Sequence, residues 1–221
     1  MSTGKFYDES TTFTHTEAVV GLCDEDQKLW LTKAASTGTI EYWKLPRKDQ
    51  LQFDEARLSE MNTLLELGAF RLLSLEESLA FMEKHPEYVL PSRWVDRWKP
   101  QDDRSVKAKS RMVVLGFKDP HVLQLERSAP TPTSEGLTSV LQVMASLNFD
   151  AVSADLKNAF GQSKPTNRKQ KVASTLPQGL VQAGFKADPR QLLICETEVY
   201  GLISGPSWLR QTVISFFTSM G

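Results

Sequence analysis

The sequence has little of what marks secreted or membrane-embedded proteins. Its 221 residues include two cysteines, Cys23 and Cys195, which make neither a disulfide framework nor a zinc site and fit a reducing compartment. No apolar run approaches the roughly 18 residues that a membrane-spanning helix needs. The opening stretch, "MSTGKFYDESTTFTHTE", holds no apolar signal segment. We therefore expect an intracellular protein, cytoplasmic or nuclear, that is not secreted and has no membrane partner.

The chain also lacks an internal repeat, and its charge is spread unevenly. Hydrophobic residues make up 40% and charged residues 24%, which is ordinary for a globular protein. Residues 1–90 carry 9 Lys or Arg against 16 Asp or Glu, and residues 91–221 carry 17 against 11, so −7 and +6 add up to the net charge of −1. The later part thus has the sign expected of a phosphate-binding surface, the alternative being a solvated face of mixed charge.

Periodicity divides the chain into an extension and a domain. Residues 1–52 are acidic and weakly periodic, which predicts an extension with limited order of its own. Residues 53–221 are expected to form one domain. It begins with a helix from Phe53, for which Gly68 is the stop signal, and continues with a second helix that opens on a Ser74–Glu77 capping box.

The rest of the domain reads as hairpins and helices that do not alternate regularly. "YVLPSRWVDRWK" and "VKAKSRMVVLGF" predict a β-hairpin, and "FRLLS", "VASTLP" and "LLICETEVYGL" predict shorter strands. "GPSWLRQTVISFFTSM" predicts a helix with Pro206 in its first turn. A helix capped by Ser134 is expected to bury a stripe of apolar residues, namely Leu137, Val140, Leu141, Met144 and Leu147. This pattern favours an α+β fold with an antiparallel sheet and packed helices.

The stretch "SADLKNAFGQSKP" contains the most unusual residue of the domain. Val152, Ala154 and Leu156 predict one face of a buried strand, with Asp155 on the other face. A carboxylate there can hold a hard cation such as Mg²⁺, and the alternative is a structural pair with Lys157 or a backbone amide. Phe160 follows five residues on, where it would pack beside such a ligand or belong to the core.

Two further stretches are suited to binding an anion. Lys107, Lys109 and Arg111 alternate along the second hairpin strand, so they share one face and can contact phosphate. The alternative is that these charges only keep an exposed face of the hairpin soluble. "YGLISGPSW" places glycines and a helix N-terminus together, which favours close approach of an anion, although plain turn chemistry explains it as well.

The order of these motifs resembles the reverse transcriptase of copia-type LTR retrotransposons. The helix "FDEARLSEMNTL", the hairpin ending in "KAKSRMVVLGF", the loop "SAPTPTSEGLTSVL", and then "DLKNAF", "LPQG" and "VYGLISGPSW" follow one another as the corresponding segments do in that family. The resemblance covers roughly residues 53–221. It implies the fingers and the first half of the palm of a right-hand polymerase, which copies an RNA template from a DNA primer with deoxynucleoside triphosphates.

The resemblance also implies roles for individual residues. Asp155 matches the first palm aspartate, a ligand of the two Mg²⁺ ions that carry nucleotide transfer in that family. Phe160 matches the aromatic residue that excludes a ribose 2′-hydroxyl. Lys107, Lys109 and Arg111 match the cations that grip the incoming triphosphate, and Ser204 lies where a glutamine contacts nucleotide or template.

Three departures from the family pattern limit what the chain is expected to do. The family continues to a Y-V-D-D hairpin with the remaining metal ligands, whereas the Asp102-Asp103 pair here lies in a charged turn without flanking apolar residues. Ile203 and Ser204 replace Lys and Gln, and Gly161 replaces Leu. We expect a truncated reverse transcriptase that is inactive alone. The alternatives are a non-catalytic nucleic-acid-binding remnant and a functionless gene fragment, and the oligomeric state is left open.

Overall fold

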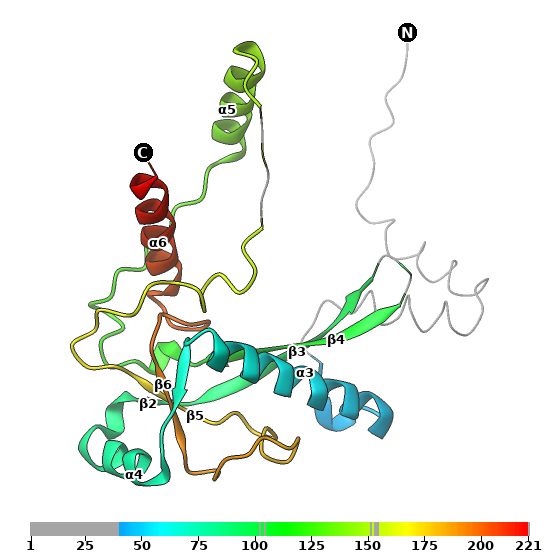
Figure 1. Ribbon diagram of the computed structural model, residues 1–221, viewed down its shortest axis with the longest axis vertical. Helices are drawn as coiled ribbons and strands as arrows, with labels where there is room; N and C mark the ends of the chain where they lie inside the picture. The colour runs from blue at the N-terminus through cyan, green and yellow to red at the C-terminus, as the bar shows by residue number, and fades with distance from the viewer. Residues whose placement is uncertain (1–39, 102, 104, 151, 153–154, 221) are drawn as a thin grey trace. The chain divides into compact units, whose positions relative to one another are not determined.

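The computed structural model describes residues 40–101, 103, 105–150, 152 and 155–220. Its helices are α3 (Arg47–Glu66), α4 (Leu75–Lys84), α5 (Ser134–Ser146) and α6 (Gly205–Ser219) (Figure 1). Its strands are β1 (Phe70–Leu72), β2 (Val89–Leu90), β3 (Ser92–Pro100), β4 (Val106–Val114), β5 (Ala173–Thr175) and β6 (Leu192–Cys195). Single 3-10 turns cover Tyr42–Lys44, Pro86–Tyr88 and Gly116–Lys118. The predicted α+β class is confirmed.

The chain divides into two compact units. The first comprises Met1–Arg57 and Val95–Arg111, and the second comprises Leu58–Trp94 and Met112–Gly221. Helix α3 begins at Arg47 because the carbonyl of Pro46 accepts the amides of Asp49 and Gln50 at 2.9 and 3.0 Å. The helix therefore crosses the predicted boundary between residues 52 and 53. Most of the predicted extension, residues 1–39, lies outside the described residues.

The first unit is built around a small aromatic cluster and a buried ion pair. Phe53 of α3 packs on Trp98 of β3, with ring centroids 4.7 Å apart, and Ala108 of β4 completes the buried cluster. Beside it the guanidinium of Arg57 donates to the carboxylate of Asp96 at 2.6 Å. Both side chains are about 5% exposed or less. The hairpin β3–β4, predicted from its alternating pattern, thus buries one face.

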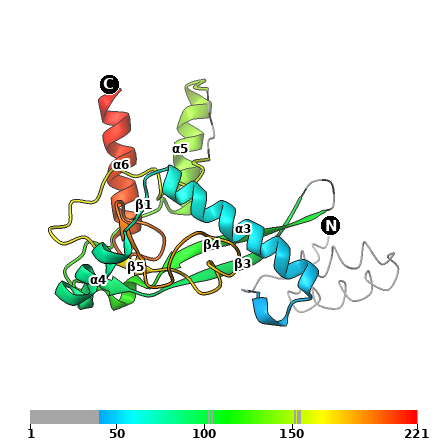
Figure 2. The same cartoon turned by 60° about the horizontal axis from the view of Figure 1, so that its bottom comes forward.

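The second unit contains a four-stranded mixed sheet in the order β1-β6-β5-β2. β6 pairs antiparallel with both β1 and β5, and β2 pairs parallel with β5. All four residues of the central strand β6 are buried. On one side, Phe81 and Met82 of α4 pack against the cluster that includes Ile194, so α4 lies beside the sheet in both views (Figure 1; Figure 2).

The start of α4 carries the predicted capping box. The amide of Glu77 donates to the Ser74 hydroxyl at 3.1 Å, and the amide of Ser74 donates to the Glu77 carboxylate at 2.7 Å. Two amide groups at the helix start are thereby satisfied. This prediction, made from a four-residue pattern, is confirmed.

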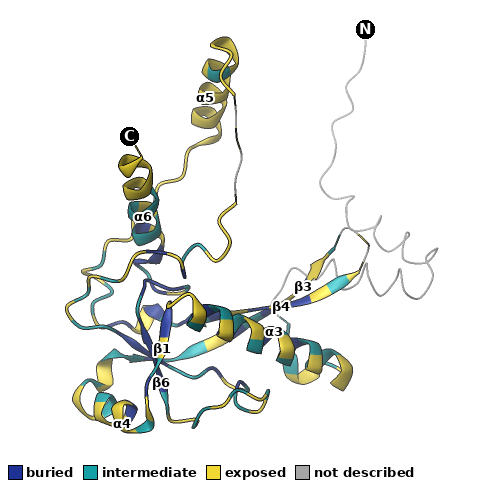
Figure 3. Ribbon diagram, viewed as in Figure 1, coloured by how far each residue is buried: buried dark blue, intermediate teal, exposed yellow. Residues whose placement is uncertain are grey.

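The prediction that α5 turns its apolar stripe to the core is wrong. No described residue of α5 is buried, and Leu137, Val140 and Leu141 are 53, 57 and 50% exposed. Figure 3 shows α5 exposed or half-buried along its length. The helix itself was predicted, but its cap is Thr133, whose hydroxyl accepts the Gly136 amide at 3.1 Å, and not Ser134. Periodicity identifies an apolar face without saying what covers it.

The predicted strand around Asp155 is also wrong. Val152 is 93% exposed and Leu156 is 60% exposed, and neither residue lies in a strand. Ala154 lies outside the described residues. A strand needs a hydrogen-bonded neighbour, and neither sheet among the described residues includes this stretch. Asp155 is therefore an exposed residue rather than a buried acid.

Helix α6 begins as the sequence predicts, with Pro206 in its first turn. Its later residues Ile214, Phe216 and Phe217 are 48, 59 and 62% exposed. None of the described helices has the length and apolar character that crossing a bilayer requires.

Candidate functional site

Two stretches of the family resemblance meet in the second unit at the end of β4. The amide of Val114 donates to the carbonyl of Tyr200 at 2.9 Å, and the amide of Gly116 donates to the carbonyl of Gly201 at 3.2 Å. The stretches "VVLGF" and "VYGL" are therefore joined by backbone hydrogen bonds, although they lie more than 80 residues apart in the chain.

The contact leaves no room for side chains at the two glycines. Gly201 has φ of +95°, and a Cβ there would lie 1.9 Å from the carbonyl oxygen of Val114. A Cβ at Gly116 would lie 2.3 Å from the carbonyl oxygen of Gly201. Both clashes involve backbone, which cannot rotate away as a side chain can. Glycine is thus required at both positions for these two stretches to meet.

Phe160 of the third stretch, "DLKNAF", lies at the same place. Its ring centroid is 4.4 Å from that of Tyr200, and a Cβ at Gly205 would lie 3.2 Å from its ring. The hydroxyl of Thr197 donates to the Phe160 carbonyl at 3.3 Å. Phe160 is half-buried between Tyr200 and the first residue of α6. The ring lies against the turn that contains Gly201 and Gly205, so backbone atoms of this turn lie close to the ring.

A buried charged network holds the turn that leads into α6. Arg168 forms two hydrogen bonds with the carboxylate of Glu198, at 2.6 and 2.8 Å, and a third with Asp119 at 2.5 Å. The Ser204 hydroxyl donates to Glu198 and accepts from Arg168 at 2.9 Å. The side chains of Arg168, Glu198 and Asp119 are 8, 3 and 1% exposed. One guanidinium therefore joins the loop after β4, the loop before β5 and the turn before α6.

The network changes the titration of its members. Burial by itself would raise the pKa of Glu198, but hydrogen bonds from Arg168, Ser204 and Thr166 outweigh it, so this pKa lies below its ordinary value of 4.5. Burial would likewise lower the pKa of Arg168, and its two carboxylate partners raise it instead. Burial raises the pKa of the nearby Cys195 thiol, with the Glu198 carboxylate adding to the shift. Cys195 is therefore a protonated, unreactive core residue.

The predicted metal ligand stands alone in the described part of the chain. Asp155 is exposed, and none of the described ion pairs includes it, so the alternative pairing with Lys157 does not form either. Across residues 40–101, 103, 105–150, 152 and 155–220, no three His, Cys, Asp or Glu side chains gather in a group that would hold a metal ion. Among the described residues, Asp155 is thus the one carboxylate at the predicted metal position, and no two-metal site forms there.

The predicted cationic residues lie as the alternation requires. Lys107, Lys109 and Arg111 are exposed on β4, and Ala108 and Ser110 between them are buried. These three cations share one strand face in the first unit. Asp155, Phe160 and Ser204 belong to the second unit, where Phe160 and Ser204 both flank the start of α6. The Ser204 hydroxyl, predicted to contact nucleotide, is bonded within the Arg168 network.

Sequence reasoning missed Arg168, Asp119 and Glu198 as a unit. Arg168 lies in the basic stretch "SKPTNRKQK", and its partner carboxylates lie 30 and 49 residues away in the chain. One signal pointed to them. Glu198 lies in "LLICETEVYGL", a run predicted as a strand, and a carboxylate buried there needs a cation.

Comparison with known proteins adds no further information. A scan against protein-family models found no match, and neither did searches of curated proteins and of solved structures. The functional argument therefore depends on the residues and their geometry.

Proposed function

We propose that this chain is a partial reverse transcriptase of the copia type, with the fingers and the first half of the palm of a right-hand polymerase. Its partners would be an RNA template, a DNA primer and deoxynucleoside triphosphates, and its cofactor in a complete enzyme would be Mg²⁺. The chain itself would bind nucleic acid without extending it. The proposal extends the α+β class of the fold to a specific architecture.

One observation carries the proposal. The stretches "VVLGF", "DLKNAF" and "VYGL" were singled out by their order along the chain, and they meet at Phe160, Tyr200 and Gly201. The glycines of two of these stretches stand where any other residue would clash with backbone. An accidental likeness of short motifs gives no reason for them to converge, whereas a shared site does.

The convergence supports the role proposed for Phe160, and the family resemblance supplies the roles proposed for the other residues. Phe160 would border the ribose of an incoming nucleotide and exclude a 2′-hydroxyl. Lys107, Lys109 and Arg111, which lie in the first unit, would contact phosphate, since Arg and Lys on an exposed strand suit phosphate oxygens. Asp155 would bind Mg²⁺ in a complete enzyme. A lone exposed carboxylate does not organise two divalent ions, so the described residues do not fit the two-metal site and we derive no transfer step through it.

A primer-extension assay tests the proposal. The chain is incubated with a poly(rA)/oligo(dT) primer–template, Mg²⁺ and dTTP, and both binding and extension are measured. We expect the primer–template to be bound and not extended. Extension above a no-enzyme control, abolished by Asp155→Ala, would show that the chain holds a working metal site. Absence of binding at low salt would contradict the proposed function itself.

A second candidate is a nucleic-acid-binding remnant without any nucleotide site. The isolation of Asp155 favours it, because an exposed carboxylate outside any ligand cluster has no described catalytic partner. The two candidates differ in their response to nucleotide. A partial polymerase would bind dTTP more tightly than UTP once primer–template is present, and Phe160→Ala would remove this preference. A simple remnant would bind nucleic acid equally with or without either nucleotide.

A further inference from the structure

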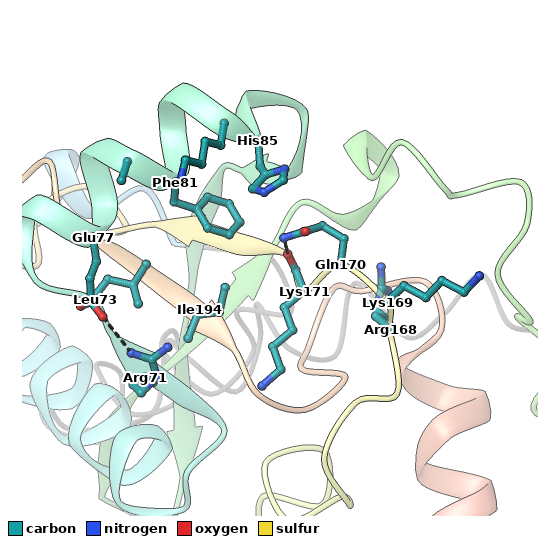
Figure 4. Close-up of a pocket in the computed structure, with 12 residues that line it drawn as sticks. Arg71, Leu73, Glu77, Phe81, His85, Arg168, Lys169, Gln170, Lys171 and Ile194 are labelled. Carbon is teal, nitrogen blue, oxygen red and sulfur yellow. Dashed lines mark hydrogen bonds and ion pairs between the residues drawn. The ribbon is translucent and has the colours of Figure 1, made fainter.

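A second cationic surface lies on the second unit, apart from the turn that carries Phe160. A groove of about 570 Å³ runs between α4 and the loop that leads into β5. Figure 4 shows its lining, with the rings of Phe81 and His85 next to each other and the side chains of Lys169 and Lys171 extending from the loop. Grooves of this size accommodate a nucleotide-sized ligand.

The lining of the groove carries an excess of positive charge. Its cationic lining residues are Arg71, Lys84, Arg168, Lys169 and Lys171, and its one acidic lining residue is Glu77. Arg168 is neutralised within its own buried network. Glu196 pairs with both Arg71 and Lys171, which leaves these two cations partly neutralised. Within the described part of the chain, Lys84 and Lys169 form no ion pair, and both are exposed. Two lysines on opposite walls are thus available for an anion.

The floor of the groove is aromatic and apolar. The centroid of Phe81 lies 5.5 Å from that of His85, and Leu73 and Ile194 line the surface beside them. Phe81 and His85 are both half-buried, and both line the groove. Aromatic surface flanked by lysines is the combination that binds single-stranded nucleic acid, because bases stack on the rings while phosphates contact the cations.

From this arrangement we infer that the groove binds a single-stranded segment of nucleic acid. Phosphates lie against Lys84 and Lys169, and a base contacts the Phe81–His85 surface. The inference rests on the proposed function for its choice of RNA as the first ligand, and it assigns that ligand a contact surface that does not include the fingers cations or Phe160.

The test is a salt titration with a fluorescent oligo(U) strand and the full chain. Fluorescence anisotropy gives the affinity of the wild type and of the Lys84→Glu/Lys169→Glu variant. We expect the variant to bind at least tenfold more weakly. We also expect the slope of log K against log salt to fall by about 1.4, since each phosphate contact with a single strand contributes about 0.7.

The matched control reverses two exposed lysines outside the groove, Lys48→Glu and Lys186→Glu, with the same change in net charge. If this control loses as much affinity as the groove variant, general charge explains the binding and the inference is overturned. Phe81→Leu, which keeps an apolar side chain, is expected to weaken binding severalfold without changing the salt slope. An unchanged affinity in both the Lys84→Glu/Lys169→Glu and the Phe81→Leu variants would also overturn the inference.

Two further arms separate the ligand sources and the two proposals. Inorganic phosphate, added at the same phosphate concentration as the strand, should not displace oligo(U). Full displacement would show that the groove binds a free anion rather than a strand, which would overturn the inference. The proposed polymerase function is tested with the primer–template duplex. Wild-type binding of the duplex with no binding of oligo(U) would overturn the groove alone, and the reverse result would contradict the polymerase function alone.

Discussion

At the scale of single residues, Gly116 and Gly201 determine whether the candidate site can assemble. Each approaches the backbone of the other stretch, and Gly201 also has a positive φ. The sequence of one stretch does not reveal the close approach or the positive φ, because a glycine in a short motif is explained just as well by an ordinary turn. The structure shows that the requirement is one of space as well as of backbone conformation.

The first prediction concerns Gly201→Ala. We expect it to lower the free energy of unfolding by about 2–4 kcal/mol, because strain at positive φ adds to a clash with the Val114 carbonyl. The matched control is Gly136→Ala in α5, where the new Cβ would meet its nearest atom at 3.4 Å and helix propensity favours alanine. Urea unfolding of both variants is the measurement. Equal effects would contradict the close contact.

Glu198 gives a prediction about pH. Its pKa in the folded chain lies below 4.5, so its contribution to stability is present above this value and is lost as the pH falls through the folded pKa. Glu198→Gln should therefore be destabilised by about 3–5 kcal/mol at neutral pH, since it leaves Arg168 short of a buried partner. The difference from wild type should shrink below about pH 4. Chemical unfolding across this range, with the exposed Glu87→Gln as control, checks it. A constant difference would contradict the role of the charge.

Asp155 gives a prediction about metal. Because the residue is exposed and the described part of the chain holds no ligand cluster around it, we expect millimolar MgCl₂ to leave the melting temperature unchanged at matched ionic strength. Asp155→Asn should change the free energy of unfolding by less than about 0.5 kcal/mol. Thermal unfolding measures both. Stabilisation by Mg²⁺ that disappears in Asp155→Asn would show a metal site within the chain.

At the scale of secondary-structure elements, local patterns predicted what local forces determine. The Ser74–Glu77 cap and the β3–β4 hairpin follow from chemistry within a few residues, and both formed as expected. The predicted strand around Asp155 did not form, because alternating apolar residues specify a strand only where a neighbour pairs with it. The sequence did not predict the Arg168–Glu198 pair, because the pair joins loops 30 residues apart and local patterns do not report such contacts.

Helix α5 illustrates the same limit, and its exposed stripe can be tested. We expect Leu137→Ser/Leu141→Ser to change the free energy of unfolding by less than about 1 kcal/mol, because each side chain is already about half exposed. Leu193→Ala, at a fully buried position of β6, should cost about 2–5 kcal/mol. Urea unfolding compares the two variants. A similar loss in both would mean that the stripe is covered in solution.

At the scale of the whole molecule, charge is distributed in a way that fits a nucleic-acid partner. The net charge of −1 combines an acidic first part with a basic later part. The basic residues include the β4 face of the first unit and the groove of the second. The sequence alone predicted the sign of this asymmetry and the first of the two surfaces. It did not predict the groove, whose walls come from α4 and from a loop more than 80 residues later.

The central proposal is that the chain binds an RNA–DNA primer–template and that the cations of β4, proposed to contact phosphate, contribute to this binding. Its most direct test is an anisotropy titration of a labelled primer–template against salt. The wild type is compared with Lys107→Glu/Lys109→Glu/Arg111→Glu and with an equal charge change at the exposed residues Lys48, Lys118 and Lys186. The account predicts that the β4 variant loses most of its affinity and that its salt slope falls by up to about 2.7, while the control keeps both. Failure of the wild type to bind at low salt, or an equal loss in the control, would contradict it.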